Sequence, residues 1–389
     1  MNRRTAPAIY RKTLAVTRGL DGKLKLDGEG KSVEWLVSMN RFDQETLFDR
    51  MAVSDRLTPV LMTALADSIT EFHQAAEADI SRKGSAAMRW VVDGNSHEIQ
   101  QRTPGLFGVS RTGLLKARSQ EVLGDVSELL DRRADQGQLR HCHGDLHLRN
   151  ICLFEGRPTL FDGVEFNEAI TSIDVLYDLA FLLMDLEHRG HRDLGNVVFN
   201  RYLAMTEELD GLAAMLLFLA SRAAIRAHTT AAAAEAQSDP ESVRALEVEA
   251  CAYLDLACEY FVPKPPRLIA VGGLSGTGKS TLARQLAPLV GRAPGALVLR
   301  SDVIRKRLFG VAPEVQLDAA AYTKEQSGRV YARMQRDAAD AIAAGQSVIV
   351  DAVFARAEER AAIENIAREA AVPAMGLWLE APKGFFRRG

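Results

Sequence analysis

The hydrophobic positions of this chain follow different patterns on the two sides of a proline-rich segment, residues 263–266. Before this segment, a few short alternating runs give way to long stretches in which apolar residues recur every three to four positions, which is typical of amphipathic helices. After it, compact apolar runs alternate with helical segments. Because proline interrupts helices and stiffens a chain, we interpret residues 263–266 as a linker between a first domain, residues 1–262, and a second domain, residues 267–389.

The first domain begins with three short runs that favour strands, at residues 14–17, 23–26 and 34–39. The turn-forming pairs Asp21-Gly22 and Asp27-Gly28 separate them. Strands joined by such turns pair with their neighbours in an antiparallel manner. The pattern therefore predicts a small antiparallel sheet.

A helix-rich region follows this sheet. Thr58-Pro59 is a favourable helix start, and apolar residues then recur at helical spacing, at Leu61, Leu65, Ile69 and Phe72. Similar patterns predict helices within residues 114–130, 173–186 and 212–260. The alanine-rich run around residue 230 is compatible with a helix or with a loop.

The second domain contains four compact apolar runs, at residues 267–271, 296–299, 347–350 and 375–379, with helical segments between them. This alternation predicts a doubly wound parallel sheet. The fold class is therefore α/β plus α+β: a helix-rich domain followed by an α/β domain. Ligands bind at the carboxyl ends of the strands in such sheets, and polar residues follow three of the four runs.

Composition narrows the range of functions. The 389 residues carry a formal net charge of -3, so no broad cationic surface exists to collect nucleic acid. The densest apolar run, residues 212–220, is too short to cross a bilayer, and the chain starts with polar sequence. The cysteines show no paired spacing, which indicates reduced thiols: Cys142, Cys152, Cys251 and Cys258. We expect a cytoplasmic protein with no nucleic-acid or membrane partner.

Residues 273–280 match the phosphate-loop pattern G-x-x-x-x-G-K-[ST], with an apolar strand before the loop and a helix after it. The glycines let backbone N–H groups surround phosphate oxygens, and the helix dipole favours the negative charge. Lys279 is expected to reach the β- and γ-phosphates, and the Ser280 hydroxyl to join the shell of Mg²⁺. The predicted ATP-binding residues are Gly273, Leu274, Ser275, Gly276, Thr277, Gly278, Lys279, Ser280 and Thr281.

The segments after the second and third predicted strands resemble small-molecule phosphate-loop kinases of the gluconate kinase and zeta-toxin type. By this resemblance, Asp302 is a base or acceptor-orienting group, Arg305 binds the acceptor or its phosphates, and Asp351 contributes to the Mg²⁺ site. Simpler interpretations remain open: Asp302 and Asp351 as helix caps, and Arg305 as part of a solvated helix face.

A second candidate site lies in the first domain. Residues 143–150 have the spacing of a kinase catalytic loop, in which an aspartate accepts the proton of the acceptor and an asparagine binds Mg²⁺. Asp162 follows Asn150 by twelve residues, at the end of an apolar run. Asp145, Asn150 and Asp162 are together the minimum set for direct phosphoryl transfer. The simpler alternative is a pair of solvated turn aspartates, Asp145 and Asp162.

The segment from His143 to about residue 189 resembles the aminoglycoside phosphotransferase family, whose loop reads H-G-D. The whole chain resembles a bacterial two-part protein in which such a domain is fused to a phosphate-loop, AAA-type kinase domain. The resemblance implies that Asp145 is the catalytic base, that Asn150 and Asp162 bind Mg²⁺, and that Asp178 supports the loop from a helix. It makes His143 a structural brace. A metal site formed by the neighbouring histidines, His141, His143 and His147, is the less favoured alternative, since no cysteine or glutamate completes it.

The chain also departs from these families. No glycine-rich loop precedes the third predicted strand, and Lys23 and Lys25 are expected at an exposed edge rather than at a nucleotide. The lid of the second domain is not recognisable, and Arg387 and Arg388 replace its arginines only if the end of the chain folds back. Both ends therefore look truncated, as in a fragment or an altered reading frame.

These features predict an ATP- and Mg²⁺-dependent phosphotransferase that acts on a small-molecule hydroxyl acceptor. The alternative is a nucleotide-binding regulatory or interaction module with a degenerate kinase-like domain. Acceptor-binding residues are expected between residues 166 and 260, where Asp185, Glu187 and His188 are polar candidates. The sequence does not identify the acceptor or the oligomeric state.

Overall fold

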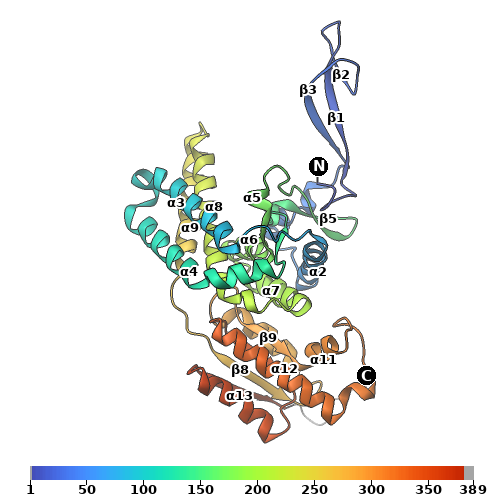
Figure 1. Ribbon diagram of the computed structural model, residues 1–389, viewed down its shortest axis with the longest axis vertical. Coiled ribbons are helices and arrows are strands. Elements are labelled where there is room, and N and C mark those ends of the chain that lie inside the picture. Colours follow the sequence, from blue (N-terminus) through green and yellow to red (C-terminus); the bar gives the residue numbers. More distant parts are fainter. Residues whose placement is uncertain (1, 381–389) are drawn as a thin grey trace.

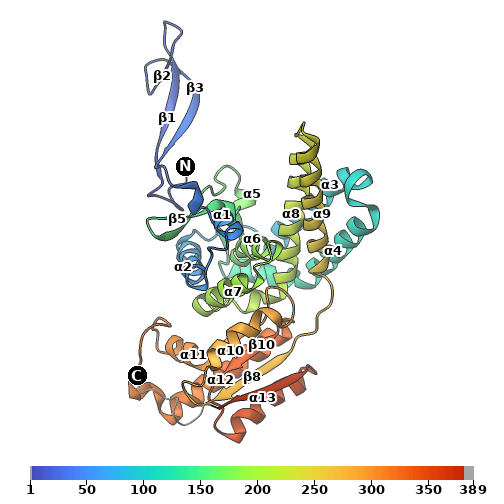
Figure 2. The same cartoon turned by 180° about the vertical axis from the view of Figure 1, so that it is seen from behind.

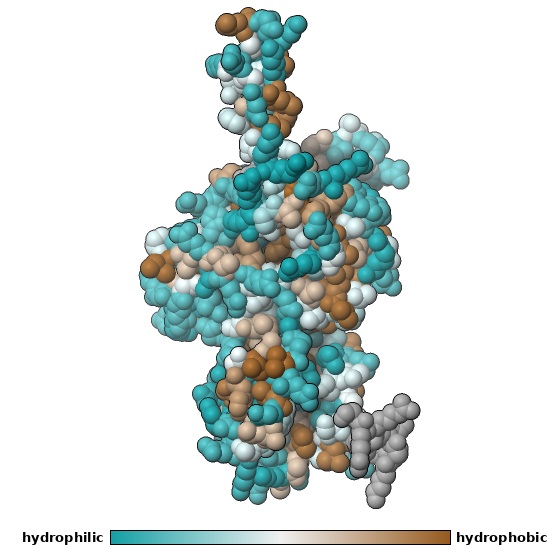
Figure 3. All heavy atoms as spheres, turned by 90° about the vertical axis from the view of Figure 1, so that its right-hand side faces the viewer, coloured by the Kyte–Doolittle hydropathy of each residue, from teal (hydrophilic) through white to brown (hydrophobic). Residues whose placement is uncertain are grey.

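A slender antiparallel sheet stands away from the rest of the molecule (Figure 1). The structure is a computed structural model that describes residues 2–380. The sheet has the order β2-β1-β3, which confirms the prediction of a small antiparallel sheet. Its strands are β1 (Tyr10–Arg18), β2 (Leu24–Leu26) and β3 (Lys31–Met39). Many of its apolar side chains are exposed, including Trp35, so apolar and polar atoms are interspersed on its surface (Figure 3).

A helical body follows the sheet. Its helices are α1 (Phe48–Val53), α2 (Pro59–Ala75), α3 (Gly84–Arg102), α4 (Val109–Asp135), α5 (Glu168–Thr171), α6 (Val175–His188), α7 (Arg192–Thr206), α8 (Met215–Glu235) and α9 (Pro240–Glu259). Shorter helical turns lie at η1 (Gln44–Thr46), η2 (Thr103–Phe107), η3 (Leu148–Asn150) and η4 (Asp210–Ala214). As predicted, Thr58 caps α2: its hydroxyl accepts the N–H of Leu61 at 3.2 Å.

One helix boundary differs from the prediction. The apolar run of residues 173–186 is not helical from its first residue, because Ile173 pairs with Arg140 in a short two-stranded sheet formed by β4 (Leu139–His141) and β7 (Ser172–Asp174). Asp174 then caps α6 by accepting the N–H of Leu176 at 2.8 Å. The alanine-rich run near residue 230 is helical and belongs to α8.

The second domain contains a four-stranded sheet of order β11-β8-β10-β9, and all of its pairs are parallel. Its strands are β8 (Leu268–Gly273), β9 (Leu297–Arg300), β10 (Val348–Asp351) and β11 (Ala374–Leu379), in agreement with the predicted runs. Its helices are α10 (Lys279–Leu286), α11 (Ser301–Leu308), α12 (Lys324–Ala343) and α13 (Ala357–Glu369), with short turns η5 (Ala287–Leu289) and η6 (Ala319–Tyr322).

Alternate residues of β10, one of the two inner strands, pack on opposite faces of this sheet. Val348 and Val350 join the core that includes Met334 of α12, whereas Ile349 joins a separate cluster with Ala283 of α10. Helices therefore cover both faces, as the predicted doubly wound sheet requires, and α10 is seen best from behind (Figure 2). The carboxyl end of β8 leads into the phosphate loop, that of β9 leads directly into α11, and β10 ends at Asp351.

Helix α7 of the body packs against the edge strand β9 and joins the two domains. The Asn200 side chain accepts the N–H of Val298 at 2.6 Å and donates to the carbonyl of Ala296 at 3.2 Å. At the end of α7, Glu207 pairs with Arg307 of α11 and with Arg333 of α12. The domains thus share polar contacts as well as a continuous apolar core.

One helical stretch among the described residues, Asp210–Glu235, is long and apolar enough to span a membrane. It corresponds to η4 and α8, and most of it is buried inside the body against α6 and α9. Burial in the core explains its apolar composition.

Candidate functional site

The candidate catalytic loop lies between β4 and a hairpin formed by β5 (Ile151–Phe154) and β6 (Arg157–Leu160). Glu155 and Gly156 have positive φ values and form its tight turn. The N–H of Phe161 donates to the carbonyl of Asn150 at 2.9 Å, across the open end of the hairpin. The hairpin therefore brings Asn150 close to the segment that carries Asp162, although the two lie twelve positions apart in the sequence.

Asp145 is held by its neighbours in the loop. Nδ2 of Asn150 donates to Oδ2 of Asp145 at 2.8 Å, and Nε2 of His147 lies 3.3 Å from the same oxygen. Burial alone raises the pKa of Asp145, but the hydrogen bond and charge of His147 outweigh it and lower this pKa to about 2. The carboxylate is thus ionised at neutral pH, and 39% of the side chain remains exposed.

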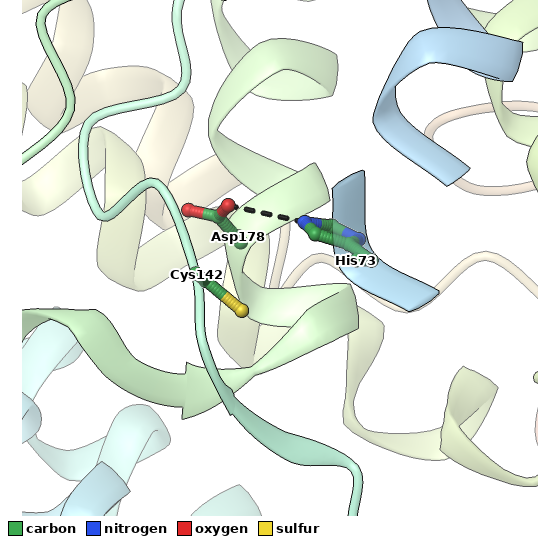
Figure 4. Close-up of side chains that lie close together, drawn as sticks. All are labelled: His73, Cys142 and Asp178. Carbon is green, nitrogen blue, oxygen red and sulfur yellow. Dashed lines mark hydrogen bonds and ion pairs between the residues drawn. The ribbon is translucent and has the colours of Figure 1, made fainter. Parts of the chain in front are cut away.

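Asp178 on α6 lies against the candidate catalytic loop and supports it (Figure 4). Its carboxylate accepts the N–H of His143 at 3.0 Å and that of Gly144 at 2.9 Å. Gly144 has a φ of 82°, a conformation that favours glycine. Burial raises the pKa of Asp178, yet the hydrogen bond from His73 and the nearby charges give a net decrease. The position matches the support that the resemblance implied.

His73, Cys142 and Asp178 lie close enough together to suggest a metal site, and all three are buried (Figure 4). Their hydrogen bonds argue for a structural role. Nε2 of His73 lies 3.1 Å from Asp178, and its Nδ1 lies 2.9 Å from the hydroxyl of Tyr202. Burial raises the pKa of the Cys142 thiol well above its usual value, which disfavours the thiolate that would bind a metal. We interpret the cluster as a brace of the catalytic loop.

The neighbouring histidines take different positions. Nε2 of His143 lies 3.0 Å from the carbonyl of Phe161, which ties the loop to the hairpin, while burial lowers its pKa. His141 belongs to β4, and His147 contacts Asp145. Asp185, a candidate for the acceptor site, accepts the N–H of Leu148 at 3.0 Å and so supports the same loop.

A cleft of about 740 Å³ lies on one side of Asp145. Asn150, Asp162 and His147 also line it. Four arginines that the sequence analysis did not single out contribute positive charge: Arg41, Arg50, Arg149 and Arg226. Guanidinium groups bind phosphate oxygens well, so the cleft combines carboxylates with phosphate-binding groups. Of these arginines, only Arg149 lies in the recognised motif.

Asp145 also lines a second cavity, of about 460 Å³. Its lining comes from α3, α6, α8 and the segment around α5, and it is mostly apolar. The region predicted for acceptor binding contributes Tyr177, Phe181 and Arg222, whereas α3 was not anticipated. Glu187 pairs with Arg192 and His188 stacks on Tyr253, outside this lining.

In the second domain, the phosphate loop connects β8 to α10. Gly273, Gly276 and Gly278 all have positive φ values, which permit the tight turn. A Cβ at Gly273 would lie 2.4 Å from the carbonyl oxygen of Leu379, so a larger residue would also clash with β11. The ammonium group of Lys279 donates to the carbonyl of Leu274 at 2.7 Å, within the loop itself. Burial lowers the pKa of Lys279, although Asp351 opposes this shift.

Ser280 and Asp351 meet at the end of β10. The hydroxyl of Ser280 donates to Oδ2 of Asp351 at 2.5 Å, and Nε of Arg300 lies 3.5 Å from the same oxygen. These two predicted Mg²⁺ ligands come from separate elements: Ser280 lies in the first turn of α10, after β8, and Asp351 is the last residue of β10. The parallel pairing of β8 with β10 brings them together.

The other two predicted residues of this domain lie on α11. Asp302 pairs with Lys306 at 3.0 Å, one helical turn further on. Arg305 is buried and turned to other partners: it donates to the carbonyl of Ala321 at 2.7 Å, and its guanidinium lies 4.7 Å from the centre of the Tyr322 ring. The interpretation of Arg305 as a solvated helix face is therefore wrong. Its predicted role towards the acceptor stays a prediction.

Both sites offer ligands that suit Mg²⁺. This ion prefers oxygen donors such as carboxylates, and Ser280 with Asp351 supplies two oxygens that already lie in contact. In the first domain, Nδ2 of Asn150 is directed to Asp145, which leaves its Oδ1 as the possible ligand beside the Asp162 carboxylate. The residues present therefore fit the ion at either site.

Comparison with known proteins identifies the first domain. Residues 3–217 match the phosphotransferase enzyme family, and this range is more than half of the chain. The protein belongs to the phosphotransferase enzyme family. Residues 268–388 match an AAA domain. The predicted combination of an aminoglycoside phosphotransferase-like domain and a phosphate-loop kinase-like domain is confirmed, and it supports phosphotransferase activity in general. Such families generally use ATP and Mg²⁺.

Two mycobacterial relatives and one solved structure resemble this chain. Uncharacterized proteins of Mycobacterium tuberculosis and Mycobacterium bovis are 29% identical over 353 residues, which cover 88% of this chain and 68% of theirs. An ethanolamine kinase of Plasmodium vivax is 13% identical, with a TM-score of 0.37, over 59% of this chain and 66% of that one. Arg387 and Arg388, considered above as lid residues, lie outside the described residues.

Proposed function

We propose that the protein transfers the γ-phosphoryl group of ATP to a hydroxyl group of a small molecule, with Asp145 as the group that receives the acceptor. One observation carries this proposal: Asp145 lines both the arginine-containing cleft and the apolar cavity. A carboxylate between a phosphate-binding cleft and a separate organic pocket is where phosphoryl transfer requires its base. The cleft is the proposed nucleotide site and the cavity is the proposed acceptor site.

In the proposed reaction, the acceptor hydroxyl donates a hydrogen bond to Asp145 while its oxygen attacks the γ-phosphorus. The new oxygen–phosphorus bond forms as the bond to the bridging oxygen breaks, ADP leaves, and the acceptor proton passes to Asp145. Because its pKa is about 2, Asp145 is a weak base that acts mainly by positioning. Such a role suits the loose transition state of phosphoryl transfer.

Asn150 and His147 orient the Asp145 carboxylate through the contacts described above. Asn150 and Asp162 would hold Mg²⁺, which neutralises charge on the phosphates when it is bound. The arginines of the cleft, among them Arg41 and Arg226, are suited to bind phosphate oxygens.

We also propose that the second domain binds ATP at residues 273–281. The contact between Ser280 and Asp351 and the glycine conformations support this proposal. Asp302 would orient an acceptor there if it separated from Lys306, and Arg305 would have to leave Ala321. The first domain is therefore the better candidate for transfer, and the second for nucleotide binding.

The alternative, a nucleotide-binding module without transfer, draws support from the N-terminal sheet. Lys25 lies on β2, at the far end of the protruding sheet and away from the cleft (Figure 1). No lysine lines the cleft among the described residues. The arginines would then bind a nucleotide without promoting its reaction.

The two proposals differ in their response to acceptors. ADP release by the full chain should be measured with Mg²⁺ and ATP, first alone and then with sugars, aminoglycosides, nucleosides and neutral alcohols. A phosphotransferase shows acceptor-stimulated ADP release and a phosphorylated product. Saturable ATP binding with no stimulation by any acceptor would favour the binding module.

A further inference from the structure

The cavity beside Asp145 has a composition that restricts its ligands. Its volume of about 460 Å³ lies in the range of sites that enclose drug-sized molecules. Trp90 of α3, Ile173 of β7, Phe181 of α6 and Ile225 of α8 give it an apolar lining on several sides. Binding in this cavity removes apolar surface of the lining from water, and this favours a ligand that is itself apolar.

Negative charge on the lining is scarce. Besides Asp145, the lining contains one carboxylate, Glu98, and Oε2 of this residue lies 3.2 Å from Nη1 of Arg102. His228, another lining residue, lies 3.2 Å from Oδ1 of Asn95. Burial lowers the pKa of His228 to about 4, so this side chain is uncharged at neutral pH. A ligand with several ammonium groups would find no set of free carboxylates.

The arginine of the lining, Arg222, is held by neighbouring residues. Arg222 is buried, and it donates to the carbonyls of Tyr177 and Gly144 at 3.1 and 3.2 Å. Its guanidinium lies 3.8 Å from the centre of the Tyr177 ring and 4.6 Å from that of Phe181. One face of each ring is therefore occupied by a cation. A ligand ammonium placed there would meet the charge of Arg222 instead of an open aromatic face.

Two lining residues, Tyr177 and Arg222, each have a buried donor without a hydrogen-bond partner among the described residues. The hydroxyl of Tyr177 and Nη2 of Arg222 form no hydrogen bond with the described residues, but Nη2 forms an ion pair with the carboxylate of Asp178 at 3.7 Å. The charge of Arg222 is therefore already balanced by Asp178.

We propose that the acceptor is an uncharged, largely apolar alcohol, and that it is neither a polycationic aminoglycoside nor a small amino alcohol. This inference rests on the proposed function, because it assigns the cavity to the acceptor of Asp145. Neutrality follows because Glu98 and Arg222 are already paired with Arg102 and Asp178, and because Arg222 covers a face of each aromatic ring.

Gly94 provides a direct way to fill the cavity. It lies in α3 on the lining, and a Cβ at this position meets no atom within 4 Å. Gly94→Phe should therefore occupy the cavity without backbone strain. Gly124 in α4 has equally open surroundings and does not line the cavity, so Gly124→Phe is a matched control.

The test measures binding by calorimetry with the full chain in the absence of ATP. The probes are anisyl alcohol, cinnamyl alcohol and menthol as neutral alcohols, kanamycin as a polycation, and choline as a small amino alcohol. At least one neutral alcohol should bind about tenfold more tightly than kanamycin or choline. Gly94→Phe should weaken its binding about tenfold or more, while Gly124→Phe should leave it unchanged. Thermal unfolding of both variants checks that they fold.

Equal or tighter binding of kanamycin or choline would overturn the inference. So would the absence of binding by every neutral alcohol, or binding that Gly94→Phe leaves unchanged. Addition of Mg²⁺ and ATP then separates the two proposals. A neutral alcohol that binds in the cavity but yields no phosphorylated product contradicts the proposed function and leaves the cavity assignment in place. Preferred phosphorylation of kanamycin would support the proposed function and contradict the inference that the acceptor is a neutral alcohol.

Discussion

The two candidate sites are held in place by different parts of the chain. Around Asp145, side chains from distant segments fix the loop: Asp178 and Asp185 on α6 accept its backbone N–H groups, and His73 on α2 supports Asp178. The phosphate loop instead depends on its own glycines and on contacts such as that between Lys279 and Leu274. A local motif can therefore specify the second site, whereas the first requires the folded body.

This difference also separates the proposed roles. The Asp145 site is bordered by an organic cavity and by a cleft with arginines, so two substrates can meet at one carboxylate. In the second domain, Arg305 is engaged by Ala321 and Asp302 by Lys306. The second site thus has the groups for nucleotide binding, but its acceptor groups are directed to other partners.

The largest expected effect is on stability, and it comes from a substitution that removes the side chain supporting the loop of the first site. Asp178→Ala leaves two loop N–H groups and His73 without their buried partner. Loss of one partner from a buried charged network should lower the free energy of unfolding by about 3–5 kcal/mol. Urea unfolding measures this value, and Asp125→Ala on the exposed face of α4 is the control. Equal effects of the two substitutions would mean that Asp178 does not support the loop.

The corresponding change in the second site should affect binding rather than folding. Lys279→Ala removes an ammonium group that is expected to contact phosphates, and a charged hydrogen bond of this kind is worth about 1.5–3 kcal/mol. ATP affinity of the phosphate loop should fall about 10- to 100-fold, with an unchanged thermal midpoint. Titration calorimetry on the full chain with Mg²⁺ and ATP measures the affinity, with Lys264→Ala as the control. Undiminished affinity at both nucleotide sites would refute the proposed role of Lys279.

A smaller effect is expected where the two domains meet. Asn200→Ala leaves the N–H of Val298 on the edge strand β9 without its partner. An unsatisfied buried donor should cost about 1–3 kcal/mol of stability. Because β9 belongs to the second domain, proteolysis should cut that domain faster in the variant. Unchanged proteolysis of both domains would show that α7 does not stabilise β9.

The smallest expected effect concerns pH. The pKa of Asp145 is about 2 in the folded protein, below its usual value of 3.8. A lowered pKa means that the ionised group stabilises the fold above pH ~4, and that this contribution is lost as the pH falls towards 2. The stability difference between the protein and Asp145→Asn should therefore shrink over this range in acid unfolding experiments. A difference that grows as the pH falls would reverse the assigned shift.

Much of the fold could be predicted from the sequence. Each strand of the parallel sheet coincides with a compact apolar run, and Thr58 marked the start of α2 correctly. The helix expected from Ile173 was wrong at its first turn, because pairing with Arg140 in the β4–β7 sheet overrides the apolar periodicity. The local sequence pattern does not reveal a strand partner that lies thirty-three positions earlier in the chain.

The candidate sites were predictable to different degrees for the same reason. The spacing of Asp145, Asn150 and Asp162 follows from a motif and a hairpin, both of which are local. His73 and the α3 lining of the cavity carry no motif, and only tertiary packing brings them to the loop. Arg305 is a case in which the sequence pattern misleads. Its position suggested a ligand-binding or solvated residue, but its side chain is buried and donates to the carbonyl of Ala321.

The most direct test of the account compares acceptor-stimulated product formation in Asp145→Asn and Lys279→Ala. If transfer occurs at the first site, Asp145→Asn should reduce kcat/KM for the best acceptor about 100- to 10,000-fold, whereas Lys279→Ala should leave it unchanged. Loss of transfer in Lys279→Ala with full activity in Asp145→Asn would contradict the account and assign the reaction to the phosphate loop.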